Sequence, residues 1–238
     1  GCGIPVAKHG NKAVSSKSGA ADVLSSLGIK LDCDMSLVER ALAEANITFL
    51  MAPRHHAAMR HVGPTRAALG VRTIFNLLGP LSNPALVKRI MVGVFDQSYC
   101  ASFAHVLAQL GATHAWVVHG ADGLDEVSTT GKTHVAALHN GTVREFTISP
   151  DDIGLRTASL DQLRGGDGDH NARYLRALLE GETGPYHDVV LFNAAAALVA
   201  GGHAEGLQQA ATQAQEALDS GKALAALDNL IAITNDKA

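Results

Sequence analysis

The sequence predicts an α/β protein with a mainly parallel central sheet flanked by helices, together with part of a small helical lobe. Three observations lead to this fold class. Short apolar strands alternate with amphipathic helices, and such βα units build parallel sheets. A stretch rich in His, Arg, Pro and Gly interrupts the alternation over residues 52–84. Of the 238 residues, 47% are apolar and only 18% are charged, against about 25% charged in an ordinary domain, which indicates a well-buried core.

The first βα units lie before this stretch. We expect strands at residues 4–7 and 47–51, and helices at 21–27 and 36–45. Gly28 is a suitable C-cap for the first helix. In the second helix Leu, Val and Ala recur at helical spacing, and Ser36 with Glu39 forms a capping box.

Residues 62–84 are expected to leave the sheet for a helical lobe, because Gly and Pro divide this stretch into short helical pieces. The chain would then consist of the first part of an α/β domain over residues 1–61, the helical excursion over residues 62–84, and the second part of the same α/β domain over residues 85–238.

The alternation of strands and helices resumes after the excursion. Asn140-Gly141 suits the turn of a β-hairpin, and the nearly wholly apolar run at 189–200 predicts a central helix. The expected strands are 89–95, 114–119, 134–138 and 142–148, and the expected helices are 98–110, 170–179, 189–200, 207–218 and 222–233.

Composition excludes several classes of protein. A net charge of −4 does not favour nucleic acid or an anionic membrane as a partner. No apolar run approaches the roughly 18 residues that cross a bilayer. The three cysteines form no CxxC pair, which argues against a zinc site and fits a reducing, cytoplasmic compartment.

A polar loop after the first strand is the first candidate site. It combines Lys8, Lys12 and Lys17 with three serines and leads into a helix, whose N-terminus favours a phosphate. The loop matches neither the Walker A pattern nor GxGxxG, so NTPase and dinucleotide sites lack their usual support. The alternative is a solvated basic loop with a serine N-cap.

Three carboxylates after the strand at 114–119 form the second candidate site: Asp122, Asp125 and Glu126. Ligands bind beyond the carboxyl ends of parallel strands, and one or two carboxylates with substrate phosphates are typical of a Mg²⁺ site. A basic loop and an acidic pair at two strand ends of one sheet would suit a magnesium–diphosphate ligand. The alternative is an acidic surface turn.

The histidines and arginines of residues 52–84 form the third candidate site: His55, His56, Arg60, His61, Arg66 and Arg72. One of these guanidinium groups could hold a carboxylate through two hydrogen bonds. Zinc is disfavoured because the twin histidines His55 and His56 have no further ligand at the usual spacing. The alternative is a solvated helix face.

Four stretches together resemble one family: VAKHGNKAVSSKSGAADVL, APRHHAAMRHVGPTRAALGVRTIFNLLGPLSNPA, HGADGLDEVS and LFNAAAAL. They are similar, in order and over nearly the whole chain, to the anthranilate phosphoribosyltransferases of tryptophan biosynthesis. The resemblance implies an α/β lobe with a helical lobe, Mg²⁺ as cofactor and a homodimer. It also implies transfer of phosphoribosyl from 5-phosphoribosyl 1-diphosphate to anthranilate, giving N-(5-phosphoribosyl)anthranilate and diphosphate.

The resemblance also implies roles for individual residues. Asp125 and Glu126 would hold Mg²⁺. Anthranilate would be bound by Asn11, His56 and Arg66, with Arg66 on its carboxylate. The phosphoribosyl diphosphate would be bound by Lys8, His9, Gly10, Asn11, Lys12, Ala13, Val14, Ser15, Ser16 and Ala20.

The sequence departs from the family pattern in three places. Ala20 stands where serine is frequent, and Ala57 stands where proline is usual. The family's N-terminal helices and GTGGD loop do not occur, so the sequence reads as starting inside a domain, and weak catalysis is expected of these residues alone. Two alternatives stay open: an enzyme like pyrimidine nucleoside phosphorylase, and a non-catalytic relative that binds nucleic acid.

Overall fold

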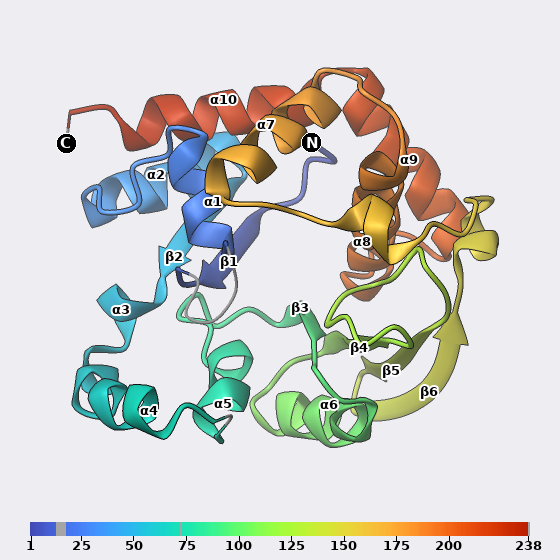
Figure 1. Ribbon diagram of the computed structural model, residues 1–238, viewed down its shortest axis with the longest axis horizontal. Coiled ribbons are helices and arrows are strands. Elements are labelled where there is room, and N and C mark those ends of the chain that lie inside the picture. The colour runs from blue at the N-terminus through green and yellow to red at the C-terminus, as the bar shows by residue number, and fades with distance from the viewer. Residues whose placement is uncertain (13–17, 72, 238) are drawn as a thin grey trace.

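The structure is a computed structural model that describes residues 1–12, 18–71 and 73–237, with the backbone alone at residues 66 and 67. It confirms the α/β class. Strands and helices alternate as far as residue 120, a β-hairpin and then a series of helices follow, and helices surround the strands (Figure 1). Within the described residues, no helix is both long and apolar enough to cross a membrane.

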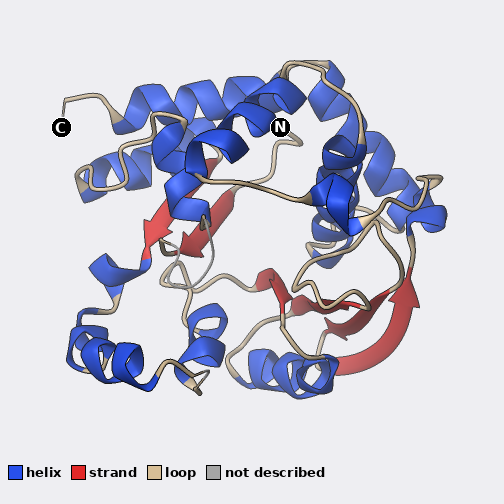
Figure 2. Cartoon of the chain, in the orientation of Figure 1, coloured by secondary structure: helices blue, strands red, loops and turns tan. Residues whose placement is uncertain are grey.

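The described strands form two separate sheets, which Figure 2 shows in red. The small sheet pairs β1 (Val6–Gly10) with β2 (Ile47–Met51) in parallel. The larger sheet has the order β3-β4-β5-β6, and only its β3–β4 pair is parallel. Its strands are β3 (Arg89–Gly93), β4 (His114–Gly120), β5 (Thr133–His139) and β6 (Thr142–Ile148).

The prediction of one mainly parallel sheet is wrong, and the antiparallel pairs of the larger sheet have a local cause. A two-residue turn can only join antiparallel strands, and Asn140 and Gly141 both have positive φ, at 46° and 85°. The predicted hairpin is therefore confirmed, and it gives the larger sheet two antiparallel pairs. Parallel pairing is confined to the βα units on either side of the helical excursion.

Two helices pack beside the small sheet: α1 (Ala20–Ser26) and α2 (Met35–Ala45). The predicted capping box of α2 is wrong. Asp34 is the N-cap, and its carboxylate accepts a hydrogen bond from the Ser36 N–H at 2.8 Å. Aspartate accepts this bond as well as serine does, so the carboxylate two residues earlier starts the helix.

The described part of residues 52–84 forms three short helices, α3 (Ala52–His55), α4 (Gly63–Leu69) and α5 (Phe75–Leu81), with a 3₁₀ turn at Ala57–His61; α4 and α5 lie in the predicted helical excursion. They lie together below the small sheet in Figure 1. Several apolar side chains at the end of α4 and in the segment between α4 and α5 are exposed, including Leu69, Val71 and Ile74. The Asn83 Nδ2 then donates to the Ala7 carbonyl at 3.0 Å, which ties the returning chain to β1.

Helices cover both faces of the larger sheet. On one face α6 (Cys100–Gln109) buries Phe103 and Leu107 against Val117. On the other face α8 (Pro185–Ala200) packs Phe192, which is fully buried, against Val118. The helix α8 begins four residues earlier than predicted, because Pro185 is well suited to its first turn.

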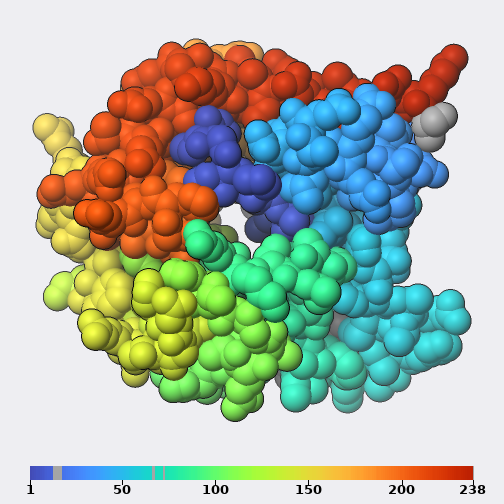
Figure 3. Space-filling view, turned by 180° about the vertical axis from the view of Figure 1, so that it is seen from behind, coloured from blue at the N-terminus to red at the C-terminus, as the bar shows by residue number. Residues whose placement is uncertain are grey.

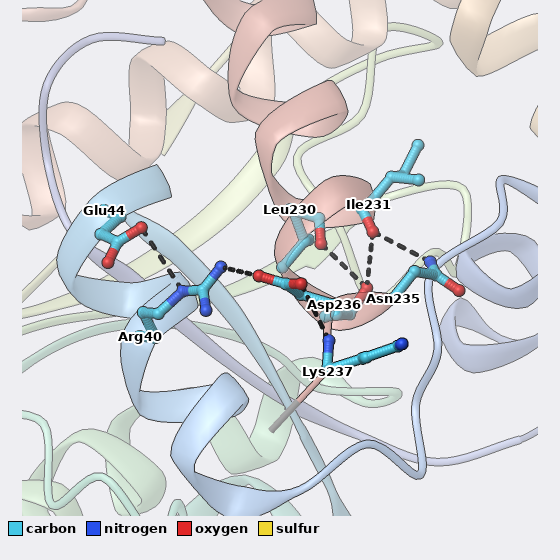
Figure 4. Close-up of polar contacts among 8 residues, drawn as sticks. Arg40, Glu44, Leu230, Ile231, Asn235, Asp236 and Lys237 are labelled. Carbon is cyan, nitrogen blue, oxygen red and sulfur yellow. Dashed lines mark hydrogen bonds and ion pairs between the residues drawn. The ribbon is translucent and has the colours of Figure 1, made fainter.

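The C-terminal helices return the chain to the small sheet. They are α7 (Gly168–Leu179), α9 (Leu207–Asp219) and α10 (Lys222–Thr234). α7 packs on α1, α9 packs on α8, and α10 contacts both α9 and α2. Figure 4 shows the end of this path, where the Arg40 Nη2 lies 2.8 Å from the Asp236 carboxylate. These contacts hold the two sheets in one molecule.

Candidate functional site

A large cleft of about 1940 Å³ lies between the two sheets. Its walls come from β1, from the helical excursion, from β3 and from the end of α8. Figure 3 shows the opening at the centre of the molecule, between the N-terminal residues, the green α5–β3 segment and the orange end of α8. The first and second candidate sites both contribute residues to this cleft: Lys8, His9, Gly10, Asn11, Asp125 and Glu126.

The end of β1 carries the first part of the candidate site into the cleft. The strand was predicted to stop at Ala7, but it continues through Lys8, His9 and Gly10, because these residues pair with Phe49, Leu50 and Met51 of β2. Lys8 is exposed. A Cβ built on Gly10 would lie 2.9 Å from the Phe49 ring, so a residue without a side chain suits this crossing.

Beyond β1 the loop begins with Asn11, whose Oδ1 accepts a hydrogen bond from the Lys12 N–H at 2.8 Å. Both side chains are exposed. The helix α1 starts at Ala20, and the Gly19 N–H just before it donates to the Asp22 carboxylate at 2.9 Å. One of the N–H groups at this helix end therefore already has an anionic partner within the protein.

Several predicted residues fall outside the described residues: Ala13, Val14, Ser15, Ser16 and Lys17. Arg66 is part of α4, where only its backbone is described. Their predicted roles stay predictions.

His9 and His56 meet across the wall of the cleft. Their Nε2 atoms lie 3.1 Å apart, and the rings are inclined at 72°. One ring must donate and the other accept, so the hydrogen bond needs at least one neutral imidazole. Burial, followed by the nearby charges of His56 and His55, lowers the pKa of His9 against the opposing effect of a backbone hydrogen bond to Gly79. The neutral form of His9 is favoured, which keeps this hydrogen bond.

Asp122 has a structural role in the acidic loop, the segment between β4 and β5 that also carries Asp125 and Glu126. Its carboxylate accepts hydrogen bonds from the hydroxyls of Ser128 and Thr130 and from the Leu124 N–H. Burial alone would raise its pKa, but these hydrogen bonds outweigh burial and lower the pKa. Asp122 therefore shapes the turn, and the two carboxylates after it reach the cleft.

Asp125 and Glu126, which are the acidic pair, lie at the edge of the cleft, close to β3. A Cβ built on Gly93 would fall 1.5 Å from the Asp125 carbonyl oxygen, so only glycine lets the loop pass this closely. Glu126 is exposed to the cleft, yet the surrounding protein removes part of its hydration. This raises its pKa, while Lys8 lowers it and Asp125 raises it further. Lys8 and Glu126 thus interact across the cleft from different sheets.

The two carboxylates fit Mg²⁺. The described residues contain no group of three or more His, Cys, Asp or Glu side chains arranged to hold a metal ion. Mg²⁺ needs fewer protein ligands than that, because it usually keeps waters and shares substrate phosphates with one or two carboxylates. Loss of hydration raises the pKa of Glu126 and the neighbouring Asp125 raises it further, so a divalent cation bound between the two carboxylates would favour their charged forms.

The expectation that the basic loop and the acidic pair share one sheet is wrong. β1 belongs to the small sheet, and the acidic pair follows β4 of the larger sheet. Residues of both still line one cleft, and the hydrogen bond from Asn83 to Ala7 of β1 ties the small sheet to the chain shortly before β3. Sequence reasoning missed the roles of Asn83, of Gly93 and of Asn193, whose side-chain amide hydrogen-bonds to the backbone of Val127 directly after Glu126. Only Asn193 gave a signal, as the one polar residue in the apolar run at 189–200.

Comparison with known proteins gives the family of this arrangement. Residues 1–224 match the model described as the glycosyl transferase family, a/b domain. The anthranilate phosphoribosyltransferase of Rhodospirillum rubrum is 58% identical over 232 residues, which cover 98% of this chain and 67% of that protein. The enzyme of the same name from Brucella canis is 55% identical, over 100% of this chain and 70% of that protein.

Solved structures agree with the sequence relatives. The crystal structure of anthranilate phosphoribosyltransferase from Thermus thermophilus superposes with a TM-score of 0.92 at 42% identity, over 99% of this chain and 70% of that one. The Saccharomyces cerevisiae enzyme in complex with PRPP and Mg superposes with a TM-score of 0.88 at 31% identity, over 98% of this chain and 65% of that one. These relatives support neither alternative, the nucleoside phosphorylase or the nucleic-acid-binding protein. The chain belongs to the anthranilate phosphoribosyltransferase family.

Proposed function

We propose that the cleft between the two sheets binds 5-phosphoribosyl 1-diphosphate, Mg²⁺ and anthranilate, and that phosphoribosyl transfer takes place there. The bond between ribose C1 and the diphosphate oxygen breaks. A bond from C1 to the anthranilate nitrogen forms, and that nitrogen releases one proton. The products are N-(5-phosphoribosyl)anthranilate and diphosphate.

The residues at the end of β1 would bind the diphosphate. Lys8 and Lys12 bring positive charge to the oxygens that become more negative as the bond breaks. Asp125 and Glu126 would hold Mg²⁺, which supplies further positive charge to the leaving diphosphate when it is bound. The yeast relative, described in complex with PRPP and Mg, supports this part of the proposal.

Anthranilate would lie against His56, with Asn11 and Arg66 as further contacts. Its aniline nitrogen is largely unprotonated at neutral pH, so transfer needs position more than a strong base. His56 is held in the wall by its hydrogen bond to His9. A yeast relative is described in complex with 4-fluoroanthranilate, which supports a site of this kind.

One observation carries the proposal: the end of β1, the acidic pair and His56 reach one cleft from distant parts of the sequence. The loss of anthranilate fluorescence in the presence of PRPP and Mg²⁺ tests it. We expect Glu126→Gln to slow turnover by about 100-fold, the order of effect of removing one such electrostatic contact. Glu182→Gln, at an exposed carboxylate outside the cleft, is the matched control. Equal rates for the two variants would reject the role of Glu126.

We also propose a cytoplasmic homodimer, a state implied by the family resemblance. The free state of all three cysteines is consistent with a reducing compartment. The molar mass measured by light scattering at several concentrations checks the dimer, and a constant monomer mass would reject it.

A further inference from the structure

Asn193 clamps the backbone directly after the acidic pair. Its Oδ1 accepts a hydrogen bond from the Val127 N–H at 3.0 Å, and its Nδ2 donates to the Val127 carbonyl at 2.7 Å. The Nδ2 also donates to the Val189 carbonyl, one turn earlier in α8, at 2.9 Å. These three hydrogen bonds fix the orientation of the Asn193 side-chain amide. Two of them also hold the backbone N–H and the carbonyl of Val127.

The clamp acts on a loop that is otherwise held by close packing. Val127 is fully buried and packs in the core between α8 and the larger sheet. On the other side of Glu126, the Asp125 carbonyl lies against Gly93 of β3. The backbone is therefore fixed immediately before and after Glu126, while the Glu126 side chain stays exposed to the cleft.

We propose that Asn193 is a positioning residue for metal binding: it holds Val127 so that the Asp125 and Glu126 carboxylates face the cleft together. This inference rests on the proposed function of the acidic pair as a Mg²⁺ site. The position of a metal ligand depends on the groups that orient it, and loss of such a supporting contact weakens metal affinity by about 10–100-fold.

The chain contains a matched control for this clamp. Asn171 holds Gly166 with the same pair of bonds, from the Gly166 N–H to Oδ1 at 2.9 Å and from Nδ2 to the Gly166 carbonyl at 3.3 Å. Both residues lie outside the residues that line the cleft. A change at Asn171 therefore removes an equivalent structural contact without touching the acidic pair.

Binding of Mn²⁺ alone, measured by the electron paramagnetic resonance signal of the free ion, tests the proposal. The variants are Asn193→Asp, which keeps the side-chain shape but loses the donor, Asn171→Asp as control, and Glu126→Gln as a ligand knockout. We expect the dissociation constant for Mn²⁺ to rise about 10-fold in Asn193→Asp and to stay unchanged in Asn171→Asp.

The outcomes separate this inference from the function on which it rests. Loss of Mn²⁺ binding in Glu126→Gln with unchanged binding in Asn193→Asp would overturn the clamp and leave the metal site standing. Unchanged binding in Glu126→Gln would overturn the metal site and the clamp with it. If Asn193→Asp does not fold, hydrogen exchange of the Val127 amide in the unaltered protein decides. The proposal expects Mn²⁺ to slow this exchange, and no change on Mn²⁺ addition would overturn it.

Discussion

At the scale of single residues, Gly93 is the point where the acidic loop passes closest to β3. We expect Gly93→Ala to displace the loop, because the new Cβ would overlap the Asp125 carbonyl oxygen. Overpacking of this kind costs about 1–3 kcal/mol of unfolding free energy. Urea denaturation measures it. Gly131→Ala is the control, because a Cβ there meets nothing within 4 Å, and equal losses in both variants would contradict the account.

The pKa of His9 makes a second prediction at this scale. Burial first, then His56 and His55, lower it from its ordinary value of 6.5, so the unfolded chain binds a proton at higher pH than the folded protein does. The favourable contribution of neutral His9 is complete above pH 6.5 and is lost as the pH falls through the lowered pKa. We expect stability to decrease over this acidic range, and His9→Gln to reduce the decrease.

Chemical denaturation at a series of pH values measures this effect. His105→Gln, at an exposed histidine of α6, is the control. A pH slope that is the same in His9→Gln and in the unaltered protein would contradict the role given to His9.

Residue types could be predicted from the sequence better than their contacts. Charged side chains gathered at strand ends predict a site that contains Lys8, Lys12 and the acidic pair. The hydrogen bond between His9 and His56 was not predicted, because it joins residues 47 positions apart. Nor does sequence order show that Asp122 is satisfied within its own turn while Asp125 and Glu126 face the cleft.

At the scale of elements, the β5–β6 hairpin depends on its two-residue turn. Gly141 has φ of 85°, a conformation that strains any residue with a Cβ. We expect Gly141→Ala to lower the unfolding free energy by about 1 kcal/mol and to leave the fold intact. Thermal denaturation followed by circular dichroism checks this. An unchanged melting temperature would contradict the strain expected of a side chain at position 141.

Elements with a local cause were predicted well. The helices α9 and α10 follow from apolar spacing, and the hairpin follows from Asn-Gly. The end of β1 was placed too early because Lys8 and His9 are polar, whereas pairing with β2 continues the strand. The division into two sheets was missed because strand order between distant segments is set by tertiary packing and not by local pattern.

At the scale of the whole molecule, the two sheets are joined by segments from opposite ends of the chain. α10 returns to α2, and α8 carries Asn193 to the acidic loop. This packing explains how charges of opposite sign, far apart in sequence, come to face one cleft. The division of the chain at residues 61 and 84 stays a prediction at this scale.

The central claim is that the cleft between the sheets binds a metal–diphosphate group through the acidic pair and the end of β1. The most direct measurement is the position of Mn²⁺, located by anomalous scattering in crystals grown with Mn²⁺ and PRPP. We predict a metal ion coordinated by carboxylate oxygens of Asp125 or Glu126, with the diphosphate between it and Lys8. Mn²⁺ and diphosphate bound elsewhere, with the acidic pair free of metal, would contradict the account.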